Sequence, residues 1–283
     1  MISKIKMPFK LYVDSRFRED VPGATDCDFK IQLPHPIVVS GKAFVDVCLV
    51  PNTFNTIRAN DNDRFYIREG TIDYRVCLLS PGQYDGFSLA TALANALNFQ
   101  SGFATAGHSY TVQYLADKNK LQIANSSPNP FYVYSIQSLL ADPGSWNIGA
   151  QAAGRPTIDP KNLMHAHSVC GYYSGHTLTG ASLDGYDMIN TLPYQQLFLR
   201  SSLGEGYDAI GPDGSSDIIR RITVGVPQNG MIQDLHGLPF DSVTVGKNRE
   251  INSLKFRLTD VFGKTVDSNG HAISFSIIFI DDD

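Results

Sequence analysis

Apolar and polar residues alternate along short segments near both ends of this 283-residue chain. The alternation has a period of two in residues 27–33, 43–50 and 273–277, which is typical of strands with one buried face. With less regular segments included, the predicted strands are 9–14, 27–33, 43–50, 64–69, 71–79, 195–201, 218–226, 242–245, 253–259 and 272–280. Pro22-Gly23 and Pro34-His35-Pro36 are expected to separate the early strands, because proline cannot donate a hydrogen bond to a neighbouring strand.

The pattern changes to a helical one between the early and late strands. Leucines recur every four residues from Leu89 to Leu97, which predicts a helix over 87–98. Asp85 or Ser88 can cap its N-terminus.

The rest of the middle is less regular. A hairpin is predicted at 109–124, with a loop at 116–119, followed by a short strand at 131–134 and a helical turn at 135–141. Residues 142–193 are rich in Gly, Pro, Ser and Asn, and we expect them to form surface loops.

Two strand-rich arms therefore flank a mixed segment. An antiparallel β-sandwich buries strands of this kind, and a jelly roll joins early and late strands in the same sheets. We predict an all-β single jelly-roll domain formed by residues 1–80 and 194–283. Residues 81–193 would form a mixed α/β, loop-rich insertion domain.

Composition narrows the classes of function. A formal net charge of −5 argues against a surface built to neutralise phosphates, so no direct nucleic-acid binding is expected. No leader pattern and no long apolar run occur, which predicts neither secretion nor a membrane span. The widely spaced Cys27, Cys48, Cys77 and Cys170 favour reduced thiols and synthesis in the cytosol or nucleus.

The strongest candidate for metal chemistry is His165-Ala166-His167, with Cys170 and His176. Two histidines two apart on a strand share one face and can begin a metal site. A cupin-type site would add a glutamate three to five residues later, yet positions 168–172 are Ser, Val, Cys, Gly and Tyr. Ordinary polar or core histidines are therefore favoured, and no metal is predicted.

Two polar clusters also have simpler interpretations. Asp14-Ser15-Arg16, with Arg18-Glu19-Asp20, is better read as an ion pair and an Asx-type turn that ends the first strand than as an acid–base pair. Asp208–Asp217 lacks the acidic spacing of a calcium loop and is read as a turn-rich crossover. No nucleophile elbow or phosphate-binding loop occurs. We predict no catalytic, cofactor-binding or metal residue, and no enzyme.

Two further sets of residues were assigned by their pattern. The first is expected in the sandwich interior or at an interface: Leu11, Phe29, Ile31, Phe44, Val47, Leu49, Phe65, Ile67, Phe198, Ile222, Leu254, Phe256, Leu258, Phe275, Ile277 and Phe279. The second contains tyrosines in or near the insertion that either bind a partner or pack beneath loops: Tyr132, Tyr134, Tyr172, Tyr173, Tyr186 and Tyr207.

A series of short motifs resembles a known family. In chain order they are Val13-Asp14-Ser15-Arg16-Phe17-Arg18, Asp28-Phe29, Val45-Asp46, Val50-Pro51-Asn52-Thr53-Phe54, Asn62-Asp63-Arg64-Phe65-Tyr66-Ile67, Pro81-Gly82-Gln83-Tyr84-Asp85, Leu97-Asn98, Leu258-Thr259-Asp260 with Gly263, Val266-Asp267 and Ile273–Phe279. Their order and spacing resemble the penton, or vertex minor capsid, proteins of Polinton-like viruses, adintoviruses and virophages, in the double-jelly-roll lineage of double-stranded DNA viruses. The resemblance covers about 9–125 and 195–281; residues 142–193 and Ser40-Gly41-Lys42 depart from it.

The resemblance implies a structural protein of the virion. It would form homopentamers at icosahedral five-fold vertices, contact the major capsid protein, and be assembled in the host cytoplasm or nucleus. The insertion could contact other minor capsid proteins or a host receptor. The base of the roll and the basic arm 1–9 could contact neighbouring major capsid subunits; the alternative for the arm is a frayed terminus. The alternatives are a non-vertex minor capsid or cement protein and a carbohydrate-binding jelly-roll attachment module.

Overall fold

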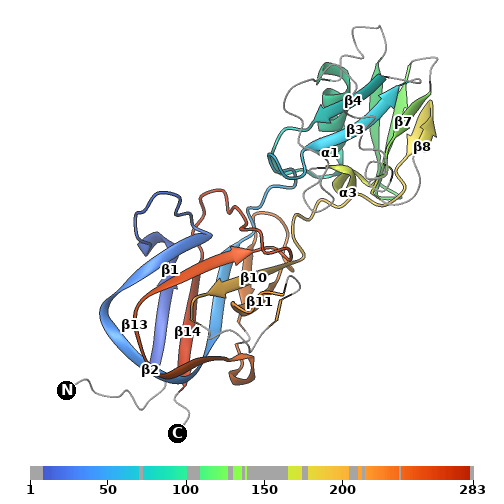
Figure 1. Cartoon of the computed structure of the whole chain (residues 1–283). Helices are drawn as coiled ribbons and strands as arrows, with labels where there is room; N and C mark the ends of the chain where they lie inside the picture. The colour runs from blue at the N-terminus through green and yellow to red at the C-terminus, as the bar shows by residue number, and fades with distance from the viewer. Residues whose placement is uncertain are drawn as a thin grey trace. The chain divides into compact units, whose positions relative to one another are not determined.

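The computed structural model describes residues 9–69, 73–100, 109–126, 130–135, 138, 165–173, 178–203, 210–211, 214–235 and 237–280. The chain divides into two compact units (Figure 1). Unit 1 contains residues 1–54 and 194–283, and unit 2 contains residues 55–193. The predicted domain boundary at residue 80 is corrected by this division, because 55–80 pack within unit 2.

Unit 1 is an all-β, antiparallel, jelly-roll-like fold, as predicted. Its described strands form one curled sheet in the order β1-β14-β2-β13-β10-β11, and β12 also pairs with β2. The strands are β1 (Phe9–Asp14), β2 (Asp28–Pro51), β10 (Gln196–Ser201), β11 (Ile218–Thr223), β12 (Met231–Asp234), β13 (Val243–Thr259) and β14 (Ser274–Ile280). Early and late strands alternate in the sheet, so neither arm of the sequence can form it alone.

The long strand β2 corrects the prediction that Pro34-His35-Pro36 separates two strands. β2 runs through this segment and pairs with β13 on both sides of it. Gln32 lies opposite Ser253 and Ile37 lies opposite Ile251, with a register shift between the two pairs. The prolines fall within this irregularity, where the ladder requires no N–H donor from them. β13 likewise joins two predicted strands, with shifts around Gly246.

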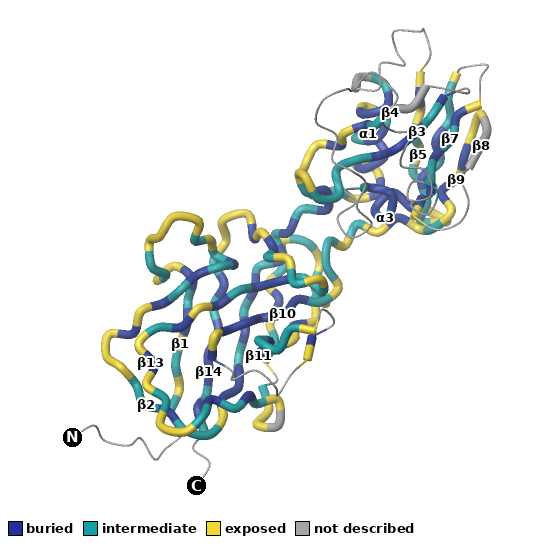
Figure 2. The backbone as a smooth tube through the Cα atoms, in the orientation of Figure 1, coloured by how far each residue is buried: buried dark blue, intermediate teal, exposed yellow. Residues whose placement is uncertain are grey.

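The core of unit 1 is made by side chains from both arms. Phe29 from β2 contacts Phe256 from β13 at 5.7 Å between ring centroids, and Phe256 meets Phe275 from β14 edge-on at 4.9 Å. β10 is almost entirely buried (Figure 2). Packing of aromatic residues from distant segments therefore fixes the sandwich.

Unit 2 is mixed α/β within its described residues. One sheet has the order β4-β3-β7-β8 and a second has the order β5-β6-β9. The elements are β3 (Arg64–Glu69), β4 (Asp73–Leu78), α1 (Gly86–Asn95), β5 (Tyr110–Leu115), β6 (Lys120–Asn125), β7 (Phe131–Val133), α3 (His167–Cys170), β8 (Leu178–Gly180) and β9 (Ser182–Asp184). The backbone continues from α1 as a short π-helix, Ala96–Gln100.

Helix α1 forms where its leucine spacing predicts it. Asp85 accepts a hydrogen bond from the Ser88 backbone N–H, and Ser88 Oγ accepts one from the Asp85 N–H, which makes a reciprocal N-terminal cap. Leu89, Leu93 and Leu97 are buried in the core of unit 2. Phe65 and Ile67 belong to this core, and not to the sandwich as predicted.

Candidate assembly surface

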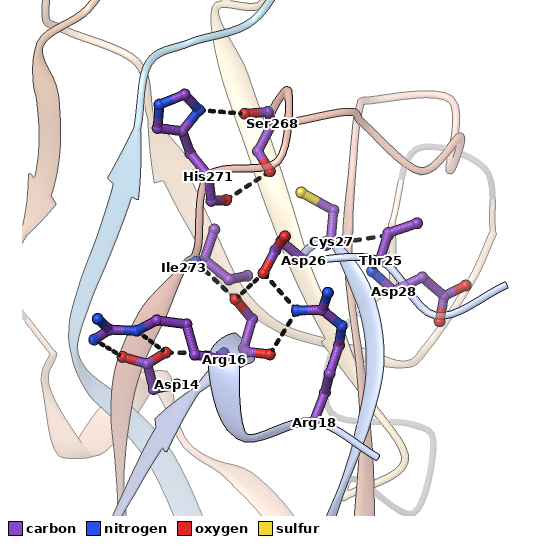
Figure 3. Close-up of polar contacts among 11 residues, drawn as sticks. Asp14, Arg16, Arg18, Thr25, Asp26, Cys27, Asp28, Ser268, His271 and Ile273 are labelled. Carbon is purple, nitrogen blue, oxygen red and sulfur yellow. Dashed lines mark hydrogen bonds and ion pairs between the residues drawn. The ribbon is translucent and has the colours of Figure 1, made fainter. Parts of the chain in front are cut away.

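The first polar motif ends β1 with a tight turn, as the sequence predicted. Asp14 accepts a hydrogen bond from the Arg16 backbone N–H at 2.9 Å and caps the 3-10 turn Ser15–Phe17. The Arg16 guanidinium also donates to both carboxylate oxygens of Asp14, at 2.9 and 2.6 Å (Figure 3). These hydrogen bonds lower the pKa of the Asp14 carboxyl below its usual value. A carboxylate held this way caps the turn and is poorly placed to accept protons.

Ser15 connects this turn to the last loop of the sandwich. Its backbone N–H donates to the Ile273 carbonyl at 3.0 Å, and its Oγ accepts from the Ile273 N–H at 3.1 Å. Ser15 Oγ in turn donates to Asp26 at 2.7 Å, and Arg18 donates to Asp26 at 2.8 Å (Figure 3). Asp26 was not singled out from the sequence, because its role depends on Ser15 and Arg18, which are brought to it by the fold of the intervening loop.

Thr25 organises the entry into β2 in a similar way. Its Oγ1 accepts hydrogen bonds from the backbone N–H groups of Cys27 and Asp28, at 3.2 and 3.0 Å. Nearby, Ser268 Oγ donates to the His271 carbonyl at 2.7 Å (Figure 3). The side chains in this region are occupied in ordering loops.

The second motif, Pro51-Asn52-Thr53-Phe54, also joins loops. The fully buried Asn52 amide donates to the carbonyls of Val226 and Pro227, at 2.9 and 3.1 Å. Thr53 Oγ1 donates to the Ser268 carbonyl at 2.7 Å. Both side chains join the end of β2 to later loops.

An open, apolar groove runs beside β1 in unit 1. Its volume is about 560 Å³, and its apolar lining includes Leu11, Val13, Ile31, Leu33, Val47 and Leu49. Leu11, Val47 and Leu49, which were predicted for the sandwich interior or an interface, are partly buried. Tyr12 and Phe17 also border the groove and are 76% and 80% exposed. Large apolar side chains exposed together in this way are typical of binding surfaces.

A charged cluster holds the opposite margin of the sheet together. Arg220 on β11 donates to both carboxylate oxygens of Asp234 on β12, at 2.7 and 2.8 Å, and to Asp241 at 3.0 Å. These hydrogen bonds raise the pKa of Arg220. The geometry is that of a structural ion pair between neighbouring strands.

Sequence reasoning missed the buried Arg200 on β10. Its side chain donates to Thr259 Oγ1 at 2.9 Å, to Asp217 at 2.7 Å and to Ser215 Oγ. The sequence does contain a signal for it: Arg200 follows the apolar run Leu197–Leu199. An arginine that is buried requires hydrogen-bond partners. Asp217 belongs to the predicted crossover 208–217, of which 208–209 and 212–213 lie outside the described residues.

The histidine pair does not lie on a strand, which is the placement that the rejected metal site would have required. His167 begins the one-turn helix α3, and its Nε2 accepts a hydrogen bond from the Tyr66 backbone N–H at 2.9 Å. The ring stacks on Phe65, with centroids 4.6 Å apart. Burial lowers the pKa of His167 to about 3 and that of His165 to about 4. His167 therefore supplies an acceptor to the edge of β3.

Two other residues, Cys170 and His176, were candidate metal ligands in this cluster. Cys170 is fully buried, and burial raises the pKa of its thiol. His176 lies outside the described residues. Within those residues, no group of three or more His, Cys, Asp or Glu side chains is arranged to hold a metal ion.

The tyrosines near the insertion divide into three groups. Tyr172 is a core residue whose hydroxyl donates to backbone carbonyls, whereas Tyr173 and Tyr186 are about half exposed. The Arg68 guanidinium lies over the ring of Tyr132, 3.9 Å from its centroid, and is also close to Tyr134. Tyr207 lies outside the described residues.

Both the sequence and the fold were compared with those of known proteins. No family model and no curated protein matches the sequence. In the part of the chain that the structure describes, each helix is too short or too polar to cross a membrane. The chain is similar to the mavirus penton protein, with 10% identity, coverage of 97% of this chain and 99% of that one, and a TM-score of 0.48. It is also similar to a chain of the Sputnik virophage, with 14% identity, 97% coverage of both chains and a TM-score of 0.39. The first is a penton protein and the second comes from a virophage. Penton proteins of virophages are among those that the sequence motifs resemble.

Proposed function

We propose that this chain is a structural capsid protein that acts by assembly, as a homopentamer at the five-fold vertices of an icosahedral virion. The proposal rests on the structural role of the residues in the motifs that resemble those of penton proteins. Asp14, Ser15 and Asn52 all order loops of one antiparallel sandwich through hydrogen bonds. In each case the named hydrogen bonds stabilise the shape of the sandwich.

The surface of unit 1 is compatible with ring formation. A cyclic pentamer uses heterologous contacts, so each subunit needs two different complementary surfaces. One candidate is the groove beside β1, and another is the exposed apolar set on the side of β12, with Met231, Leu235 and Leu238. Contacts with the major capsid protein would use other parts of the same sandwich. Catalysis has no part in this proposal.

The test combines the mass of the purified protein with its location in virions. Stable pentamers in solution and density confined to five-fold positions in symmetry-averaged images are expected. Density at three-fold or quasi-two-fold positions would overturn the vertex assignment and favour a non-vertex minor capsid or cement protein. A monomer in solution would leave the decision to the images, because the surrounding shell can be required for assembly.

One feature of unit 2 favours a second candidate, attachment to a carbohydrate. A groove of about 620 Å³ between β4 and α1 is lined by Leu78, Ser80, Tyr84, Ser88, Thr91, Ala92, Asn95 and Ala96. The lining residues are uncharged, and their hydroxyl and amide groups suit a neutral sugar, although Ser88 already donates to the Asp85 carboxylate and others make internal hydrogen bonds. Binding of the full-length protein to an array of neutral glycans, lost in Asn95→Leu, would support this role; equal binding by both proteins would exclude this groove.

A further inference from the structure

The outer edge of β1 carries no partner strand among the described residues. β1 pairs with β14 along its whole length, with Phe9 opposite Phe279 and Asp14 opposite Ser274. The Ser15 N–H points toward β14, where it meets the Ile273 carbonyl. In an antiparallel pair this orientation alternates, so the backbone groups of Lys10, Tyr12 and Asp14 point away from β14. An exposed edge of this kind is a template for another strand.

The apolar groove lies along this same edge. It is bordered by β1 on one side and by residues 31–34 of β2 on the other. On that stretch of β2, the described strand partner is β13, and the groove lies on the other side. An added strand would therefore gain hydrogen bonds from β1 and bury side chains against Leu11 and Leu33.

The chain contains a segment with the composition of such a strand. Residues 1–8, which precede β1, read Met-Ile-Ser-Lys-Ile-Lys-Met-Pro. In an extended conformation Met1, Ser3, Ile5 and Met7 would share one face, while both lysines would lie on the other. Eight extended residues span about 26 Å, and the six residues of β1 span about 20 Å, so the segment is long enough to cover the edge.

We propose that residues 1–8 of one copy dock as a strand on the free β1 edge of the next copy, with Ile5 and Met7 in the groove. A copy's own segment leaves β1 at Phe9, and it could lie along the same edge only after a reversal that uses at least two residues. Residues 1–8 of a neighbouring copy need no such reversal, so the whole segment is available to pair with β1. Donation from each copy to the next is a heterologous contact that closes in a ring. This inference rests on the proposed ring assembly and names the segment that links its subunits.

The first experiment measures docking without requiring a ring. A fluorescent peptide of residues 1–8 is titrated into a variant of the full chain that lacks only these residues. Saturable binding is expected, and an Ile5→Lys peptide should bind at least tenfold more weakly. In the protein, Tyr12→Pro removes an outward N–H and should weaken binding at least tenfold, whereas the matched Tyr12→Thr keeps that N–H and should retain most of it. Circular dichroism confirms that both variants are folded. Absence of peptide binding to folded protein would overturn the proposal.

The second experiment identifies which copy donates the segment, in the complete chain. Ile5→Cys and Tyr12→Cys are combined and treated with a short bismaleimide cross-linker; the four native cysteines are buried. A ladder of covalent oligomers is expected, while each single variant gives background levels only. A product linked only within one chain would overturn exchange between copies. Pentamers that persist after deletion of residues 1–8 would overturn the arm's role while the vertex function stands; failure of all protein to assemble, with the peptide still bound, would instead count against the vertex function.

Discussion

Ser15 and Ile273 are 258 positions apart in the sequence and are joined by two hydrogen bonds, at 3.0 and 3.1 Å. One uses the Ser15 backbone and the other its side chain, so the contact depends on residue identity as well as on the path of the chain. Ser15 is fully buried. The backbone and the hydroxyl group of Ser15 together therefore fix the turn after β1 to the residue that precedes β14.

Replacing that hydroxyl should destabilise unit 1. Ser15→Ala leaves the buried Ile273 N–H without its acceptor and removes one donor from Asp26. We expect a loss of about 1–3 kcal/mol in the free energy of unfolding, measured by chemical denaturation. Ser253→Ala on β13 is the control and should change stability by no more than about 0.5 kcal/mol. Equal effects of the two substitutions would contradict the role given to Ser15.

Replacing Asn52 with aspartate should destabilise unit 1. Asn52→Asp replaces the amide that donates to Val226 and Pro227 with a buried group that repels both carbonyl oxygens. We expect unit 1 to lose about 3 kcal/mol or more near pH 7. The exposed Asn229 provides a control, since Asn229→Asp makes the same change in charge at the surface. A stability of Asn52→Asp within error of that control would refute the assignment.

Unit 2 should lose stability in mild acid. Burial lowers the pKa of His167 from 6.5 to about 3, so the unfolded chain takes up a proton at a higher pH than the folded chain. Stability is complete above about pH 6.5 and declines as the pH falls toward 3. His165, whose pKa is lowered to about 4, adds to the same decline.

Thermal unfolding from pH 8 to pH 4 measures this decline. His167→Gln keeps an acceptor for the Tyr66 N–H and cannot be protonated, so its curve should fall less steeply with pH. His165→Gln is the matched control for the neighbouring titration. Parallel curves for wild type and His167→Gln would show that His167 does not contribute to the acid sensitivity.

All four thiols should react slowly in the native protein. Each cysteine is free and buried, and burial raises the pKa of Cys27 to about 11 and that of Cys48 to about 12. The thiolate is the reacting form, so little modification by a disulfide reagent is expected at pH 8. Complete modification should follow unfolding in guanidinium. A fast-reacting native thiol, located by mass spectrometry, would disagree with this burial.

Unit 2 should fold when excised as residues 55–193. Its two ends are tied together, because Thr56 Oγ1 donates to the Thr191 carbonyl at 3.1 Å, and its core is separate from that of the sandwich. In unit 1, Phe54 and Tyr194 lie edge-on with centroids 5.2 Å apart, so a short Gly-Ser linker can replace the insertion. Cooperative thermal unfolding of both products is expected. An excised unit 2 without a cooperative transition would show that its stability depends on unit 1.

The sequence was informative where a local pattern decides the structure. Alternation identified β14 and both ends of β2, and leucine spacing with Asp85 identified α1. It failed at Pro34 and Pro36, because a register shift in β13, 200 residues away, lets β2 pass through them. The strand β12 was missed for a similar reason, since its four residues are strand only through pairing with β2.

The candidate surface was less predictable than the fold. The turn of Asp14 and Arg16 is local and could be inferred from adjacent residues. The groove could not, because Leu11 and Leu49 follow the pattern of core residues, and their partial exposure depends on how distant strands are arranged around the groove. Likewise, residues 142–193 were expected to form loops, and the short helix α3 that brings His167 to β3 was not predicted.

The alternation of early and late strands in unit 1 has a consequence for biosynthesis. The hydrogen bonds between Ser15 and Ile273 cannot form until the 258 residues that follow Ser15 have been synthesised. At ordinary rates of translation this synthesis takes about 13–50 s. Unit 2 emerges complete during that delay and can fold on the ribosome. The first strands remain exposed meanwhile, so we expect nascent chains to need a chaperone, and premature termination near residue 200 to yield a folded unit 2 attached to an aggregation-prone N-terminal segment.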